Sequence, residues 1–258
     1  MALVKTTEEI AKMRRGGALL TQALAKAVQA VKPGVAIKDL DTIFEASILA
    51  GGGKPSFKNY QPSVHDTPFP TALCISINEE VVHGPGNRPI KLKEGDIVGL
   101  DAGCWYEGLC TDMAVTVPVG KILPQHEKLL LVTRAALLAG VKAAKVGGLI
   151  SDIGRAIENY IKPHGYGIVR ALVGHGVGHA VHEAPHVPNY YDGSYPKVKI
   201  KDGMCLALEP MVGEGDWTVE TADDGWTVRM ADGKFSAHFE VTIAVTKESV
   251  EILTPLPV

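Results

Sequence analysis

The spacing of hydrophobic and polar residues predicts two helices at the start of the chain. Residues 6–31 fit one helix, in which Thr6 and Glu9 have the spacing of a capping box. The Pro33-Gly34 pair ends this helix. A second helix is predicted over residues 37–51, where a run of glycines stops it.

Strand-like apolar runs follow a long polar segment that is rich in proline. In the first half of the chain these runs cover residues 72–77, 96–102 and 110–119. The second half then repeats the order of helices before strands. Two helices and three strand-like segments are predicted there, at residues 125–144 and 151–161 and at 167–173, 204–208 and 238–245.

Two segments of the first half have counterparts in the second. Residues 32–39 and 145–152 share Lys, Gly, Ile and Asp at the same offsets. Residues 93–101 resemble residues 201–209, since both contain a basic–acidic–Gly turn and an apolar strand that ends in a carboxylate. Internal repeats indicate repeated supersecondary units. We therefore predict an α+β fold with pseudo-two-fold halves, helices on one side and a curved antiparallel sheet on the other.

Composition and charge narrow the classes of function. The chain has 258 residues, 46% of them hydrophobic, and a net charge of −3, as in an ordinary globular protein. It contains no basic run that would indicate nucleic-acid binding and no apolar stretch that would span a bilayer. The N-terminus lacks the apolar core of a signal peptide. We expect a cytoplasmic protein that binds neither nucleic acid nor membrane.

The cysteine spacing argues against a cysteine-based metal site. Cys74, Cys104, Cys110 and Cys205 form no C-x-x-C pair. We expect these side chains to be buried, reduced thiols that pack as small apolar groups.

Two aspartates interrupt neighbouring strand-like runs. Asp101 and Asp112 flank Tyr106-Glu107-Gly108, which indicates a turn. A hairpin centred between Tyr106 and Glu107 would place the two aspartates directly opposite each other, on one face. Like charges in that position repel, and a cation between them removes the penalty. The hairpin alone equally allows a pair of aspartates on a solvated surface.

The internal repeat favours the cation. Glu209 corresponds to Asp101 in the repeat, and Glu240 matches Asp112, so four acidic residues interrupt apolar strands in corresponding places. Several hard oxygen ligands suit two divalent ions that share bridging groups.

Several histidines lie in loops beside glycine or proline. His175 lies in a Gly-rich turn, where its imidazole would complete a metal shell, or where it is incidental to a flexible loop. His182-Glu183-Ala184-Pro185-His186 matches the H-E-x-x-H pattern of zinc proteases. Because Pro185 is incompatible with a helix interior, we predict an extended loop whose two histidines need not converge. His83, beside Gly84, is either structural or catalytic.

The order of these motifs carries a resemblance that covers nearly the whole chain. The matching segments are residues 7–16, 74–79, 83–84, 95–101, 111–112, 174–178, 182–185, 208–211 and 239–240. Together they resemble the pita-bread (creatinase/aminopeptidase) metallopeptidases, and within these the type I methionine aminopeptidases. The resemblance implies a single metallopeptidase domain over residues 1–258, with halves at about 1–120 and 121–258.

The resemblance also implies roles for particular residues. Five residues resemble the family's metal ligands for two divalent ions, which would be Co²⁺, Mn²⁺, Fe²⁺ or Zn²⁺: Asp101, Asp112, His175, Glu209 and Glu240, with Asp112 and Glu240 bridging both ions. Glu209 would also act as the proton carrier, and His83 and His182 resemble the two histidines that contact the substrate.

The implied activity is removal of the N-terminal methionine from nascent polypeptides when the second residue is small. A monomer is expected, and contact with the ribosome is left open. Two rival functions are an X-Pro aminopeptidase or prolidase and a catalytically inactive binding module of the same fold. The first rival usually carries an additional N-terminal domain, for which this chain has no room, and the second should have lost ligands that are all present here.

The sequence departs from the family pattern near the expected substrate pocket. Val241 follows Glu240, where bacterial relatives usually have His. Asp66 and Thr67 occupy a segment that normally offers Tyr and apolar residues to the methionine side chain, although we expect Asp66 to point to solvent. Phe69 and Trp226 are expected to line the pocket. His179 stands where many relatives have Arg, and no role is assigned to it.

Overall fold

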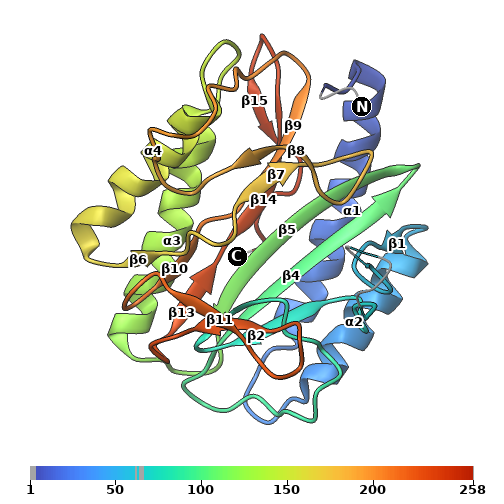
Figure 1. The fold of residues 1–258 in the computed structure, drawn as a ribbon. Coiled ribbons are helices and arrows are strands. Elements are labelled where there is room, and N and C mark those ends of the chain that lie inside the picture. The colour runs from blue at the N-terminus through green and yellow to red at the C-terminus, as the bar shows by residue number, and fades with distance from the viewer. Residues whose placement is uncertain (1–3, 62, 64–66, 258) are drawn as a thin grey trace.

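A computed structural model describes residues 4–61, 63 and 67–257 of the chain (Figure 1). The helices within these residues are α1 (Thr7–Gln29), α2 (Ile37–Ala50), α3 (Pro124–Ala143) and α4 (Ile150–Ile161), followed by the short 3-10 helix η1 (Lys162–His164). Across these ranges, no helix combines the length and the apolar character that a membrane crossing requires.

The four predicted helices are confirmed, and their ends lie within two residues of the predicted ones. The capping box of α1 is also confirmed. Thr6 Oγ1 accepts a hydrogen bond from the Glu9 backbone N–H at 3.2 Å, and the Glu9 carboxylate accepts one from the Thr6 N–H at 2.7 Å. These bonds satisfy N–H groups that have no partner within the helix.

One antiparallel sheet contains most of the strands in the described residues. Its strands are β1 (Lys54–Pro55), β2 (Cys74–Ile77), β4 (Ile97–Tyr106), β5 (Leu109–Pro118), β7 (Gly174–Gly176), β8 (Glu183–Val187), β9 (Met204–Leu208), β14 (Glu240–Val245) and β15 (Val250–Ile252). They follow the order β1-β4-β5-β14-β9-β7-β8, with β2 beside β4 and β15 beside β14.

Two small sheets flank the main one. The first contains β6 (Gly167–Ile168), β10 (Met211–Gly213) and β13 (Ser236–His238), and the second contains β3 (Glu80–Val82), β11 (Val219–Thr221) and β12 (Val228–Met230). Three predicted strands were wrong in extent. The strand predicted at residues 96–102 continues to Tyr106 as β4. Residues 167–173 contain only β6, and residues 238–245 divide at Phe239 between two sheets. An apolar run indicates that a strand is buried, but it does not indicate which sheet buries it.

The central strands are arranged symmetrically. β4 and β5 from the first half meet β14 and β9 from the second half at the middle of the sheet. α1 and α2 pack together, and α1 covers β4 and β5, whereas α3 and α4 pack together beside the strands of the second half (Figure 1). The predicted α+β class, with a curved antiparallel sheet and helices outside it, is confirmed.

The two faces of the main sheet carry different residues, because side chains alternate along a strand. One face presents Leu100, Leu206 and Val241 to the helices as part of a large buried core. Each such side chain contributes about 1.5–3 kcal/mol when it is fully buried. The opposite face carries the acidic residues Asp101 and Asp112, and no described helix covers it (Figure 1). Packing of the apolar face against the helices therefore holds the sheet in place, and the opposite, acidic face is available for a functional site.

The β4–β5 hairpin has the predicted strands but not the predicted register. We predicted Asp101 opposite Asp112, and this is wrong, because Asp112 pairs with Gly103. The turn has Glu107 and Gly108 as its central residues, both with positive φ (48° and 81°). Two-residue turns of this kind match the twist of the flanking strands. The pairing shifts by two positions, so the two aspartates still share one face.

Gly17 lies in the interior of α1 and allows close contact with the C-terminal segment. A Cβ built at Gly17 would lie 2.1 Å from the backbone oxygen of Leu253. In an exposed helix interior, Gly→Ala would stabilise by about 1 kcal/mol. Here we expect Gly17→Ala to destabilise by about 1–3 kcal/mol, because the two backbones must move apart.

Thermal unfolding checks this prediction. The matched control is Ala18→Gly at the exposed neighbouring position, which should lose only about 1 kcal/mol of helix propensity. A melting temperature of Gly17→Ala at or above that of the wild type would contradict the close contact.

Candidate metal centre

The candidate metal ligands come from five neighbouring strands of the main sheet. In order across the sheet, they are Asp101 on β4, Asp112 on β5, Glu240 on β14, Glu209 directly after β9, and His175 on β7. Residues that are more than a hundred positions apart in the sequence therefore meet at the centre of one sheet.

The strand registers place these side chains on one face. Asp101 pairs with Ala114, which in turn pairs with Glu240. The register of β14 with β9, continued by one position, brings Glu209 opposite Glu240. The pairing of β7 with β9 places His175 on the same face. Paired residues, and residues two apart on one strand, point to the same side of a sheet.

Threonine hydroxyls reinforce the boundary between β5 and β14, which has only two paired positions in the described residues. Thr242 Oγ1 accepts a hydrogen bond from the backbone N–H of Asp112 at 2.9 Å and donates to its carbonyl at 2.8 Å. Thr116 Oγ1 makes the same pair of bonds with the backbone of His238, at 2.9 and 2.8 Å. The acidic residues at this boundary therefore stand on a fixed backbone.

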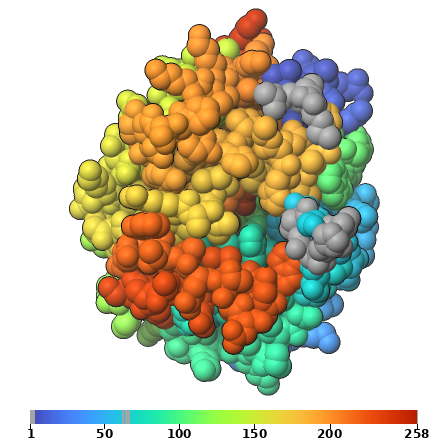
Figure 2. Space-filling view, viewed as in Figure 1, coloured from blue at the N-terminus to red at the C-terminus, as the bar shows by residue number. Residues whose placement is uncertain are grey.

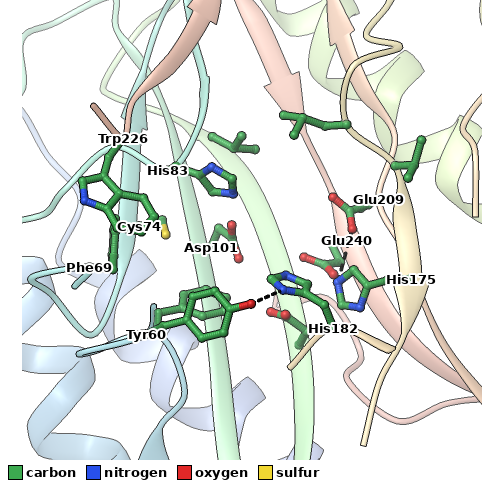
Figure 3. Close-up of a pocket in the computed structure, with 15 residues that line it drawn as sticks. Tyr60, Phe69, Cys74, His83, Asp101, His175, His182, Glu209, Trp226 and Glu240 are labelled. Atoms are coloured by element: carbon green, nitrogen blue, oxygen red, sulfur yellow. Dashed lines mark hydrogen bonds and ion pairs between the residues drawn. The ribbon is translucent and has the colours of Figure 1, made fainter. Parts of the chain in front are cut away.

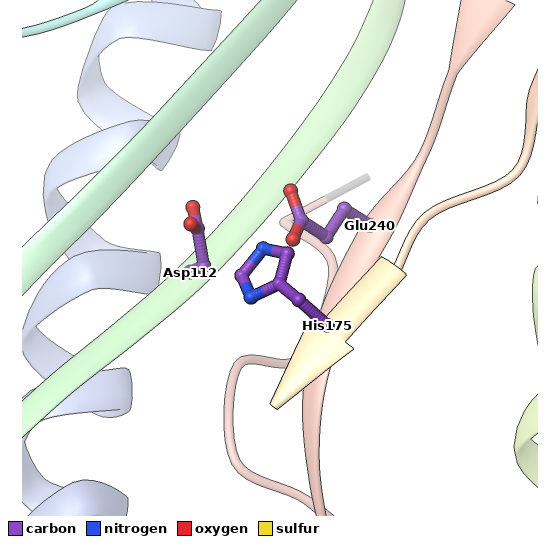
Figure 4. A group of neighbouring side chains, drawn as sticks. All are labelled: Asp112, His175 and Glu240. Atoms are coloured by element: carbon purple, nitrogen blue, oxygen red, sulfur yellow. The ribbon is translucent and has the colours of Figure 1, made fainter. Parts of the chain in front are cut away.

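Three of the candidate ligands converge closely. Asp112, His175 and Glu240 each offer one ligand atom, and these atoms lie within 4.8 Å of one another (Figure 4). His175 Nδ1 lies 2.9 Å from the carbonyl oxygen of Gly176. Because a carbonyl only accepts, Nδ1 carries the proton and the lone pair of Nε2 is free for a metal. That Nε2 is 3.5 Å from Glu209 Oε1.

Burial raises the pKa of all four carboxyl groups. It raises the pKa of Asp101 to about 7. It raises the pKa values of Asp112, Glu209 and Glu240 well above their usual range, and repulsion between neighbouring carboxylates adds to the effect. The ionised cluster is therefore unfavourable without a cation.

The donor set fits a divalent metal ion. Asp101 Oδ1 and Glu240 Oε1 are buried and have no hydrogen-bond partner among the described residues. Carboxylate oxygens together with one neutral imidazole nitrogen suit Mn²⁺, Fe²⁺, Co²⁺ or Zn²⁺. A cation would supply the missing partner for both oxygens and offset the repulsion.

The acidic face forms one wall of a pocket of about 260 Å³. Figure 2 shows the recess at the centre of this face of the molecule, and Figure 3 shows its lining. Every candidate residue named from the sequence lines it: Asp101, Asp112, His175, Glu209 and Glu240, with His83, His182, Phe69 and Trp226. The rings of Phe69 and Trp226 meet edge to face, with their centroids 5.2 Å apart.

Two pocket histidines outside the candidate ligand set, His83 and His182, are held neutral by their surroundings. Burial, with a contribution from His182, lowers the pKa of His83 to about 4. Burial also lowers the pKa of His182. A neutral imidazole has one N–H donor and one lone pair, so each ring can make one directed hydrogen bond of each kind.

Sequence reasoning missed several residues of the site, among them Val82, Leu172 and Val173 in the pocket lining. Phe57, Tyr60 and Cys74 also line the pocket. Tyr60 and Cys74 lie on the same side of it as Phe69 and Trp226 (Figure 3). Tyr60 lies at the start of a proline-rich stretch with no periodic pattern, so no local signal marked it. Cys74 was predicted only as a buried thiol, and its pairing with Asp101 across β2 and β4 appears only in the fold.

Another missed residue is His238. It is buried, and its Nε2 lies 3.9 Å from carboxylate oxygens of both Glu209 and Glu240 without a hydrogen-bond partner among the described residues. Burial lowers its pKa to about 3. The sequence feature that could have indicated His238 as a site residue is its position two residues before Glu240.

The structure also shows where the other residues singled out in the sequence lie. The H-E-x-x-H match lies in and beside strand β8, so the rejection of a zinc-protease helix is confirmed, and His186 does not line the pocket. His179 Nε2 lies 2.7 Å from a carboxylate oxygen of Glu9, which ties its loop to α1. Val241 packs in the core on the helix side of the sheet. Thr67 lines a second hollow beside the pocket.

The prediction for Asp66 falls outside the described residues.

The curved sheet, the outer helices and the buried carboxylate cluster define a metallopeptidase of the pita-bread fold. A model of metallopeptidase family M24 matches residues 11–247, and the chain belongs to this family. It is 44% identical over 243 residues to a methionine aminopeptidase of Borreliella burgdorferi, with 94% of each protein covered.

Solved structures agree with this assignment. The crystal structure of methionine aminopeptidase from Thermotoga maritima superposes with a TM-score of 0.92 at 40% identity, covering 97% of this chain and 98% of that one. The prolidase from Pyrococcus furiosus superposes with a TM-score of 0.77 at 20% identity, covering 98% of this chain and 65% of that one, which shows the shared fold alone.

The raised pKa values predict how pH affects the metal-free protein. Carboxyl groups with a raised pKa favour folding while they are protonated, and this contribution is lost as the pH rises through the folded value. For Asp101 that value is about 7, against an ordinary 3.8. The histidines with lowered pKa affect stability only below their ordinary value of 6.5. Chelated protein should therefore lose stability as the pH rises above about 6.5, through the folded pKa of Asp101 at about 7.

Calorimetry across this pH range, with a chelator or with Mn²⁺, checks the prediction. Mn²⁺ should raise the melting temperature, and should do so most at the alkaline end, where the carboxylates are ionised. A melting temperature of the chelated protein that stays constant or rises with pH would contradict it.

Proposed function

We propose that the protein is a methionine aminopeptidase, which removes the first methionine of a polypeptide whose second residue is small. The supporting observation is one pocket with Phe69, Cys74 and Trp226 on one side and the carboxylate cluster on the other (Figure 3). A thioether side chain on the first side would bring the adjoining peptide bond beside the carboxylates. High similarity over most of the chain to methionine aminopeptidases supports the same assignment.

Asp101, Asp112, His175, Glu209 and Glu240 would hold two divalent ions, with Asp112 and Glu240 between them. When bound, such ions lower the pKa of water and polarise a carbonyl group. The carboxylate of Glu209 would take a proton from water and deliver it to the leaving amine.

The pocket histidines would orient the substrate. His182 would donate a hydrogen bond to the oxygen of the scissile carbonyl, where negative charge develops. His83 would contact the amide nitrogen. Phe57, Phe69 and Trp226 would exclude water from the side chain of the first residue. An unbranched thioether fits such a narrow apolar slot with little strain, whereas a charged side chain would lose its hydration there.

We further propose that the protein acts as a monomer in the cytoplasm on the N-termini of nascent chains. The net charge of −3 provides no strong attraction to nucleic acid or to an anionic membrane surface.

The substrate assignment predicts a clear order among three peptides. We expect kcat/KM to be highest for Met-Ala-Ser, and lower for Lys-Ala-Ser and Ala-Pro-Ser by at least about tenfold, because a poorly filled or desolvated pocket costs more than about 1.4 kcal/mol. Assays with Mn²⁺, Co²⁺, Fe²⁺ and Zn²⁺ in turn separate substrate preference from metal preference. If either competitor matches the methionine peptide, the methionine assignment is wrong.

If Asp112 bridges both ions as proposed, its loss should remove both ions together. Asp112→Ala should show no tight Mn²⁺ binding by titration calorimetry and no activity, because one carboxylate serves both sites. The matched control is Asp202→Ala, which removes an exposed carboxylate and should bind two ions like the wild type. Two unaltered binding events in Asp112→Ala would contradict the assignment.

A further inference from the structure

Tyr60 and His182 come from opposite halves of the chain and meet at the pocket (Figure 3). Tyr60 Oη lies 2.9 Å from His182 Nδ1. The two rings also pack edge to face, with their centroids 5.4 Å apart. On its other side, the His182 ring meets His175 edge to face at 4.5 Å. These contacts restrain the plane of the His182 ring.

The backbone fixes the position of Tyr60. Its N–H donates to the carbonyl of Phe57 at 2.8 Å, and its carbonyl accepts from the N–H of Phe69 at 2.9 Å. A neighbouring bond joins the N–H of Asn59 to the carbonyl of Phe69 at 2.8 Å. The hydroxyl is therefore carried by an ordered turn and not by a free side chain.

The hydrogen bond at Nδ1 decides which nitrogen of His182 carries the proton. In a neutral imidazole one ring nitrogen donates and the other accepts. A phenol hydroxyl is a stronger donor than acceptor, so its proton points to the lone pair of Nδ1. The ring proton then stands on Nε2, the nitrogen that is not occupied by Tyr60.

We propose that Tyr60 is a positioning residue that holds His182 in the Nε2–H tautomer, so that Nε2 donates to the carbonyl oxygen of the bound substrate. The proposal rests on the proposed function for the identity of that carbonyl. It makes His182 the opposite of its neighbour His175, whose Nδ1 donates to the carbonyl of Gly176 and whose Nε2 therefore accepts. Two adjacent imidazoles thus serve different purposes because they have different partners at Nδ1.

The first test is Tyr60→Phe, which keeps the ring in the pocket and removes only the hydroxyl. With Met-Ala-Ser, kcat should fall at least about tenfold, as expected for a misdirected transition-state donor. KM should change less than about twofold, because the apolar lining is unchanged. Tyr191→Phe, at an exposed position, is the matched control and should behave as the wild type.

A double-mutant cycle separates positioning from direct contact. If Tyr60 acts through His182, adding Tyr60→Phe to His182→Ala should cause no further loss of kcat. A further loss of the full single-mutant size would mean that Tyr60 contacts the substrate itself, and would overturn the proposal.

A second readout does not depend on any substrate. In the Zn²⁺-loaded protein, ¹⁵N NMR of His182 should show a protonated Nε2 and an unprotonated Nδ1, and Tyr60→Phe should give a mixture of tautomers. A protonated Nδ1 in the wild type, or an unchanged tautomer in Tyr60→Phe, would overturn the proposal. Because this measurement needs no peptide, it stays decisive even if the methionine peptide is not cleaved.

Discussion

The burial of four carboxylates, which also repel one another, is the constraint on which the rest of the structure depends. Asp101, Asp112, Glu209 and Glu240 share one face of the sheet, and their raised pKa values report the free energy of holding charge there. Such a cluster persists only if the strands that carry it cannot separate. The large core between the sheet and the helices prevents that separation, because parting the strands would expose it.

Few backbone hydrogen bonds join the two halves at the boundary where their strands meet. β5 and β14 have two paired positions in the described residues, and the hydroxyls of Thr116 and Thr242 supply further bonds on either side. These bonds attach to the backbone of Asp112, which would itself hold metal, and to that of His238, two residues before Glu240. The same contacts therefore hold the two halves together and position the candidate ligands.

Much of this could be predicted from the sequence, and the exceptions have physical causes. Local signals such as caps, glycine stops and helical periodicity are short-range, so the helices were predicted nearly to their ends. It was also predictable that Asp101 and Asp112 share one face, because a register shift of two residues leaves every side chain on the same face. Their exact pairing was not predictable. That pairing depended on Glu107 adopting positive φ, which no pattern marks. Tyr60 was missed because its partner lies 122 residues away.

The same burial acts in opposite directions on the two kinds of titratable group in the pocket. It raises the pKa of the carboxyls and lowers the pKa of His83, His175 and His238, so without metal both kinds tend toward neutrality. A divalent cation would reverse only one of these effects. Its charge favours the ionised carboxylates and further disfavours protonated histidines. Metal binding would therefore release protons from the carboxyl groups, while the imidazoles stay neutral. Neutral rings are what the site requires, because a protonated His175 offers no lone pair to a metal.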